Sequence, residues 1–164
     1  MTEATDAALA APAAQRPAGV HDGYECAQAW SALTAAHARV SARLGAELAR
    51  TCGLTINDFE ILLRLDRVPE PGLRLGDLLA AVPLTQPALS RAVARLVERG
   101  CLARAGAPGD GRGVLITSTE AGRDLLRRAI PVHASTVREL LLDRLTPAEQ
   151  DLLARALTRV AAES

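Results

Sequence analysis

The feature that most restricts how this chain can fold is a change of pattern at Gly100. Before it, apolar residues recur at the three- and four-residue spacing of α-helices. After it, two short apolar runs, residues 101–104 and 114–117, flank nine residues that include four glycines. Such runs around a glycine-rich segment are typical of a β-hairpin with a flexible loop. We therefore expect a small hairpin attached to an otherwise helical protein.

The composition also favours helices. Hydrophobic residues make up 49% of the 164 residues, but aromatic residues only 2%, so the core must consist of Leu, Val, Ile and Ala. Ala and Leu are strong helix formers, whereas aromatic and β-branched residues favour strands. A chain of this length suits one domain, or a small domain with an added dimerisation element.

Glycine and capping residues divide the first part of the sequence into helices. A helical period over residues 24–50 is followed by Gly53, which can end a helix. Thr55 opens a second helix, with Asp58 three residues later in a spacing that resembles a capping box. Residues 69–72 then interrupt the helical pattern.

Two short helices follow in close succession. Residues 75–82 carry an apolar stripe that ends before Pro83, because the residue before a proline is driven out of α geometry. Thr85 can cap the next helix, which continues to about Arg99 with Pro87 in its first turn, where a missing N–H does no harm. Two short helices joined by a tight turn predict a helix-turn-helix.

Two long helices are expected after the hairpin. One begins near Thr119 and runs to about Leu142, and we expect Pro131 to kink it. The other begins at Thr146, where Glu149 completes a capping box. The predicted fold class is therefore mainly α, with a small β-hairpin.

The helix over residues 86–99 has two different faces. One is apolar and consists of Leu89, Val93, Leu96 and Val97. The other consists of Pro87, Ser90, Arg91, Ala94 and Arg95. Small residues let a helix approach DNA closely, and arginines can reach guanine edges or phosphates. Thr85 and Gln86 are polar, and the free amides at the helix N-terminus favour an anion.

The charge distribution points to the same segment. The chain has a net charge of zero, and all of its cationic side chains other than histidine are arginines. From Thr85 to Arg128, however, eight arginines stand against four acidic residues. A positive segment within a neutral chain is the electrostatic footprint expected of a nucleic-acid-binding surface.

The run LTQPALSRAVARLVERGCLAR, followed by GDGRGVLITSTEAG, resembles the recognition helix and wing of MarR-type transcriptional regulators. The resemblance extends over about residues 54–160, and its strongest marks are Arg95, Gly100, Asp110, Arg112 and Thr119. It implies a winged helix-turn-helix, with long helices forming a dimerisation region.

The resemblance also implies how DNA is bound. The recognition helices of a homodimer would enter successive major grooves of a near-palindromic site in double-stranded DNA. Arg112 would enter the minor groove, oriented by Asp110. The recognition-helix contacts carried over by position are Thr85, Gln86, Ser90, Arg91 and Arg95.

We expect four segments along the chain. These are a mobile N-terminal tail (1–22), an N-terminal dimerisation helix (23–53), a winged helix-turn-helix DNA-binding domain (54–118) and C-terminal dimerisation helices (119–164).

The resemblance implies a sequence-specific transcriptional regulator, usually a repressor in this family, which a small-molecule effector releases from DNA. Trp30, His37 and His133 are candidate ligand-binding residues, with packing or surface exposure as the alternative reading of each. No cofactor is implied.

The three cysteines, Cys26, Cys52 and Cys101, are odd in number and contain no CxxC, which argues against a disulfide framework or a structural zinc site. Some relatives sense peroxide through a cysteine near the start of the first helix, and Cys26 lies there. Cys26 is therefore either a redox-sensing thiol or a thiol without a function of its own. Cys101 is expected to be a small core residue. The histidines show no metal-ligand spacing, and no metal site is expected.

Two other classes of function are alternatives for this sequence. A protein-interaction module with weak DNA binding is compatible with the neutral net charge. An enzyme is not expected, because the sequence contains no nucleophile elbow, phosphate-binding glycine loop or zinc-ligand spacing. With no run long enough to span a membrane and no signal-peptide pattern, a cytoplasmic protein is expected.

Overall fold

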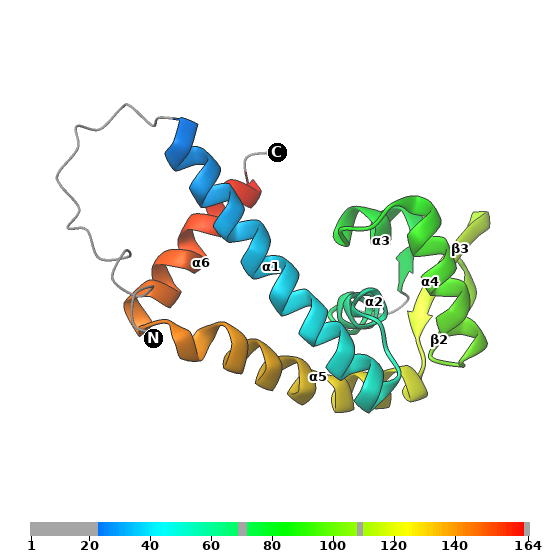
Figure 1. The fold of residues 1–164 in the computed structure, drawn as a ribbon. Helices are drawn as coiled ribbons and strands as arrows, with labels where there is room; N and C mark the ends of the chain where they lie inside the picture. The colour runs from blue at the N-terminus through cyan, green and yellow to red at the C-terminus, as the bar shows by residue number, and fades with distance from the viewer. Residues whose placement is uncertain (1–22, 69–71, 108–109, 163–164) are drawn as a thin grey trace. The chain divides into compact units, whose positions relative to one another are not determined.

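The computed structural model describes residues 23–68, 72–107 and 110–162 (Figure 1). The predicted N-terminal tail lies outside these residues. In chain order the elements are α1 (Gly23–Cys52), α2 (Ile56–Asp66), β1 (Leu73–Arg74), α3 (Leu75–Ala81), α4 (Gln86–Glu98), β2 (Leu102–Ala107), β3 (Asp110–Ser118), α5 (Glu120–Leu140), the 3-10 helix η1 (Leu142–Arg144) and α6 (Pro147–Ala162).

The chain divides into two compact units, residues 1–35 and 36–164, and the boundary falls inside α1. The described part of the smaller unit is the first half of α1, where Trp30 and Leu33 are exposed. The larger unit contains the second half of α1 and all the other elements.

Local sequence signals account for most helix ends. Gly53, with φ of 62°, follows α1 in the left-handed conformation that glycine adopts most easily. Thr55 caps α2 in a full capping box: its side chain accepts from Asp58 N, and the Asp58 carboxylate accepts from Thr55 N. At α6, Glu149 and Thr146 make the same reciprocal pair. Both predicted capping boxes are thus confirmed.

The core of the larger unit is aliphatic apart from Phe59 and Cys101. Helix α2 lies at its centre and contacts α3, α4, α5 and β3. Its Ile61 and Leu62 are fully buried, as are Leu89 and Leu96 of α4. Burial of a leucine or isoleucine side chain contributes about 1.5–3 kcal/mol, so these contacts fix α4 against α2.

The sheet is larger than the sequence indicated. It is antiparallel with the order β1-β3-β2, and the two-residue strand β1, which the sequence analysis missed, pairs through Leu73 and Ile116. Two residues are too few to show a periodicity. Gly72, with φ of 105°, precedes β1, and a Cβ there would lie 2.4 Å from the carbonyl oxygen of Ile116. Only glycine fits so close to β3.

The prediction that residues 105–113 form a loop is wrong for most of that segment. Strand β2 continues to Ala107 and β3 begins at Asp110, with an irregular register between Gly106 and Ala107. Glycine lowers the propensity for strand, but the hydrogen bonds of a ladder come from the backbone and do not need side chains.

Helix α5 ends at Leu140, two residues before the predicted end, and continues through Pro131 as one helix. Because proline has no N–H, the carbonyl of Arg127 loses its helical donor there. Among the described residues, every helix is too short or too polar to span a lipid bilayer.

Candidate nucleic-acid interface

Helix α4 exposes the face that the sequence predicted. Leu89, Val93 and Leu96 are buried, whereas Arg91 and Arg95 are exposed. Ala92, which the sequence analysis did not place in the core, is also buried. The helix has 13 residues and is therefore about 20 Å long, enough to lie in a major groove.

The N-terminal end of α4 presents unused polar groups. Thr85 is the N-cap residue, but its hydroxyl makes no capping hydrogen bond, contrary to the cap expected from the sequence. Thr85 and Gln86 are both exposed. The amides of Gln86 and Ala88 lie at the positive end of the helix dipole, which suits a phosphate, whereas Pro87 between them has no N–H.

The arginines near α4 fall into two groups. Arg91 on α4 and Arg104 on β2 are exposed and make no ion pair with any residue that the structure describes. Arg95 instead contacts Asp58 Oδ1 at 2.5 Å, and Arg99 donates to the carbonyl oxygen of Gly53 at 2.8 Å. The sequence analysis places Arg91 and Arg95 together on the outward face, but among the described residues only Arg95 of the two is paired with an acidic side chain.

Arg104 is a candidate that the sequence analysis did not single out. Together with Ser90, it borders an apolar hollow of about 170 Å³ between α4 and the hairpin. Its guanidinium is thus available beside the outward face of α4. The sequence feature that could have indicated this residue is its place at the end of the first apolar run after Gly100.

The hairpin formed by β2 and β3 carries the other predicted DNA contacts. Asp110 is the first residue of β3 and pairs with Ala107. Arg112 lies two residues further along the same strand. The side chains of Asp110 and Arg112 lie outside the part of the chain that the structure describes, so their roles stay predictions.

The three candidate ligand residues have different surroundings. Trp30 is exposed in the smaller unit. His37 is exposed on α1, with Nε2 3.3 Å from the hydroxyl of Ser41. His133 is half-buried on α5 and stacks on Phe59, with 4.6 Å between ring centroids. Burial lowers the pKa of His133, partly offset by the charge of Glu60.

A cavity of about 390 Å³ lies between α1 and α5 and is lined by neither His37 nor His133. Its α1 wall is charged: Glu47 contacts Arg43 at 3.1 Å and Arg50 at 2.6 Å. The hydrogen bond from Arg50 lowers the pKa of Glu47, so the carboxylate stays ionised. Ser135 and Thr136 contribute hydroxyls from the α5 wall.

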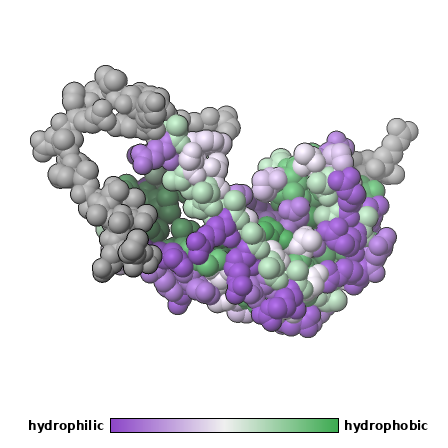
Figure 2. All heavy atoms as spheres, viewed as in Figure 1, coloured by the Kyte–Doolittle hydropathy of each residue, from purple (hydrophilic) through white to green (hydrophobic). Residues whose placement is uncertain are grey.

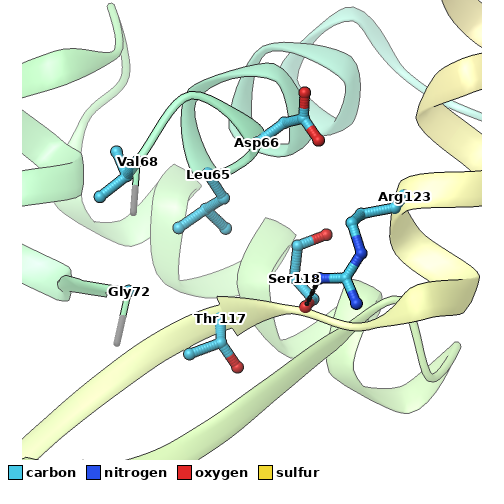
Figure 3. A pocket seen from close by; sticks show the side chains of 7 residues that line it. All are labelled: Leu65, Asp66, Val68, Gly72, Thr117, Ser118 and Arg123. Carbon is cyan, nitrogen blue, oxygen red and sulfur yellow. Dashed lines mark hydrogen bonds between the residues drawn. The ribbon is translucent and has the colours of Figure 1, made fainter. Parts of the chain in front are cut away.

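Figure 3 shows a second, smaller cavity of about 70 Å³ between the end of α2, β3 and α5. Arg123 reaches across its edge and donates to the carbonyl oxygen of Ser118 at 3.0 Å. Ligand pockets are usually about 300–1,000 Å³, so this cavity can hold only water-sized molecules.

The cysteines that the structure describes do not form an evident redox site. Cys101 is 5% exposed and packs in the core, as expected from the sequence. Cys52 is half-buried, and both thiols are free. The side chain of Cys26 lies outside the described residues. In the described part of the chain, no three His, Cys, Asp or Glu side chains gather as metal ligands.

Comparisons with known proteins agree with this geometry. A model of the MarR family matches residues 53–113. An uncharacterized HTH-type transcriptional regulator of Bacillus cereus is 31% identical over 120 residues, which cover 73% of this chain and 78% of that protein.

Solved structures extend the likeness to nearly the whole chain. Sco3205 of Streptomyces coelicolor, a MarR family transcriptional regulator in complex with DNA, is 32% identical with a TM-score of 0.79, over 87% of this chain and 92% of that one. BpsR of Bordetella bronchiseptica, whose DNA binding is regulated by 6-hydroxynicotinic acid, is 25% identical with a TM-score of 0.76, over 89% of this chain and 100% of that one.

Proposed function

Because this chain belongs to the MarR family of DNA-binding transcriptional regulators, we propose that it binds a near-palindromic operator as a homodimer and is released by a small-molecule effector. The observation that carries the proposal is the outward face of α4, where Thr85, Gln86 and Arg91 have polar groups without partners among the described residues. The proposed activity is repression in the cytoplasm, without catalysis.

The DNA contacts follow from the helix-turn-helix geometry. Helix α4 would enter the major groove, where Thr85, Gln86, Ser90 and Arg91 face bases and phosphates. Arg112 at the tip of the hairpin would enter the minor groove. Sco3205, and the repressor CouR on a 23-mer duplex at 26% identity, are relatives that were solved bound to DNA.

Exposed apolar side chains support the homodimer. Leu152, Leu157 and Val160 of α6 are 58%, 41% and 73% exposed. Figure 2 shows hydrophobic residues at the surface over α6, in contrast to the hydrophilic surface along α5. Apolar groups that gather on one helix mark an interaction site, and we propose that a second copy covers them.

Substitution of α6 tests the dimer. Leu152→Asp together with Val160→Asp should convert the dimer to a monomer in sedimentation-velocity measurements, because each carboxylate would be desolvated in an apolar interface. Arg155→Ala, on the same helix, should leave the sedimentation coefficient unchanged. A double variant that sediments as the wild type would exclude α6 from the interface.

The cavity between α1 and α5 is the proposed effector site. Its volume of about 390 Å³ suits a small organic molecule. Arg43 and Arg50 are both paired with Glu47, but their exposed guanidinium groups have further N–H donors that can bind a carboxylate. The hydroxyls of Ser135 and Thr136 donate to the carbonyl oxygen of Val132. The ligand that regulates BpsR, 6-hydroxynicotinic acid, is a small acid of this kind. To weaken DNA binding, the effector must bind more tightly to the form of the protein that cannot bind DNA.

The decisive experiment measures binding to a labelled duplex from the region upstream of the protein's own gene, beside an unrelated duplex, across a salt series. Wild type should prefer the upstream duplex, and Arg112→Ala should weaken that binding. The slope of log affinity against log salt reports the number of phosphates neutralised. No preference and no effect of Arg112→Ala would favour the protein-interaction module instead.

A further inference from the structure

Two arginines at the C-terminal end of α4 turn back into the protein. Arg95 Nη2 lies 2.5 Å from Asp58 Oδ1, and Arg99 Nη1 donates to the carbonyl oxygen of Gly53. Both acceptors lie at the corner where α1 meets α2, some forty residues earlier in the chain: Gly53 is between the two helices and Asp58 is in the first turn of α2. The end of the recognition helix is therefore attached to this corner by two polar contacts.

Asp58 is held rigidly. Its side chain is 1% exposed, one carboxylate oxygen accepts from Thr55 N at 3.0 Å, and the other accepts from Arg95. The N–H of Asp58 in turn donates to the Thr55 hydroxyl at 3.1 Å. A buried carboxylate needs a compensating charge, and among the described residues Arg95 is the cation paired with it.

Diverting Arg95 to a phosphate would leave the Asp58 carboxylate buried without a partner. The carboxylate is the buried member of this pair, at 1% exposure against 44% for Arg95, so loss of the cation leaves a buried charge uncompensated. Arg91, one turn earlier on the same face, has no such competitor among the described residues. Arg91 can therefore bind DNA without losing an ion pair, whereas Arg95 cannot leave Asp58 without this loss.

We propose that Arg95 is a positioning residue and not a DNA contact. Its ion pair with Asp58, assisted by the bond from Arg99 to Gly53, fixes the angle at which α4 presents Arg91 and its N-terminal end to the operator. The proposal rests on the proposed function, in which α4 reads DNA. A tilt of about 10° at one end of this helix would displace the other end by about 3 Å, enough to break base contacts.

Asp58→Asn is the sharpest test. Asparagine keeps an oxygen that can accept from Thr55 N, but it removes the charge that holds Arg95. If Arg95 is a positioning residue, the affinity for the operator falls about tenfold, while the affinity for an unrelated duplex does not fall. If Arg95 is free to bind phosphate, release from Asp58 raises both affinities, and the proposal is overturned.

Asp77→Asn is the matched control, because it removes the same charge from the exposed first turn of α3. Its operator affinity should stay at or above that of the wild type. An equal loss in Asp77→Asn and Asp58→Asn would mean that lost negative charge, and not the ion pair with Arg95, causes the effect. That result would also overturn the proposal.

Arg95→Gln gives a second, independent readout. Loss of a phosphate contact lowers the slope of log affinity against log salt by about 0.9 for each arginine removed, whereas loss of a positioning residue leaves the slope unchanged. This slope can be measured on an unrelated duplex, so it tests Arg95 even if the wild type shows no operator preference. A wild type without operator preference would count against the proposed function but not against the positioning role of Arg95.

The double variant Asp58→Asn/Arg95→Gln completes the cycle. Residues that act as one pair should give a double variant that binds the operator no more weakly than either single variant. Additive losses would show independent roles and overturn the proposal. Circular dichroism melting of all four proteins sets an assay temperature at which each is folded.

Discussion

The backbone of Gly122, in the first turn of α5, lies against the carbonyl oxygen of Cys101, at the start of the hairpin. A Cβ on Gly122 would be 2.1 Å from that oxygen and 2.9 Å from Ser118 Oγ. The same carbonyl accepts from Thr119 N at 3.1 Å, and the Thr119 hydroxyl donates to Gly100 O at 2.7 Å. The end of α4, both hairpin strands and the start of α5 therefore meet at one point.

Gly122→Ala should destabilise the fold by about 1–3 kcal/mol, because the new methyl group meets backbone atoms that cannot move without shifting the hairpin. Gly76→Ala in α3 is the matched control: a Cβ there meets nothing within 4 Å. This control should gain about 0.5–1 kcal/mol from the helix propensity of alanine. Urea unfolding measures both changes, and a Gly122→Ala protein as stable as wild type would contradict the close contact.

Thr55→Ala and Thr85→Ala separate a structural cap from a candidate DNA contact. Thr55 is half of the α2 capping box, so its removal should cost about 1 kcal/mol of unfolding free energy. Thr85 makes no capping bond, and its removal should change stability by less than about 0.5 kcal/mol. The Thr85→Ala protein should remain folded but bind the operator more weakly. A larger loss of unfolding free energy in Thr85→Ala than in Thr55→Ala would show that the two caps are assigned wrongly.

Arg91→Ala should weaken DNA binding and lower the salt slope by about 0.9 for each protomer, because an unpaired arginine on the outward face of α4 is the expected phosphate or guanine ligand. Arg144→Ala removes the same charge from η1, at the far end of α5 from its junction with the hairpin. Its slope should match that of the wild type. An unchanged slope in Arg91→Ala would remove this residue from the interface.

The stacked imidazole of His133 predicts a pH-dependent stability. Burial lowers its pKa in the folded protein below the ordinary value of 6.5, so the unfolded chain binds the proton more tightly. The contribution of the neutral His133 imidazole to the unfolding free energy is therefore fully present above the pKa of the unfolded chain. It is lost as the pH falls through the lower pKa of the folded protein. The unfolding free energy should be lower at about pH 5.5 than at about pH 7.5.

His133→Gln keeps a polar side chain of similar size but does not titrate in this range. The difference in unfolding free energy between the two pH values should therefore shrink in this variant. Because Glu47 and Glu149 have pKa values lowered from 4.5, they remain ionised over this interval and do not obscure the comparison. An equal pH dependence in both proteins would assign the effect to another group.

Features that depend on neighbouring residues could be predicted from the sequence. Both capping boxes, at Thr55 and at Thr146, join residues three positions apart, and the apolar face of α4 follows from the helical repeat alone. The hairpin was predicted at the right position, but its strands were predicted too short. The glycine-rich residues that extend them pair through their backbones and show no alternation of apolar and polar side chains. Strand β1 was missed because it exists only through its pairing with β3.

The sequence by itself determined that this chain is a helical protein with a helix-turn-helix, a hairpin and a basic outward helix face, because periodicity, caps and local charge are properties of adjacent residues. Only the tertiary structure decided which arginine of that face is available. Arg91 and Arg95 stand one turn apart on α4 and look equivalent in the sequence. The packing of α2 against α4 places the buried carboxylate of Asp58, 37 positions away in the chain, beside Arg95 and not beside Arg91.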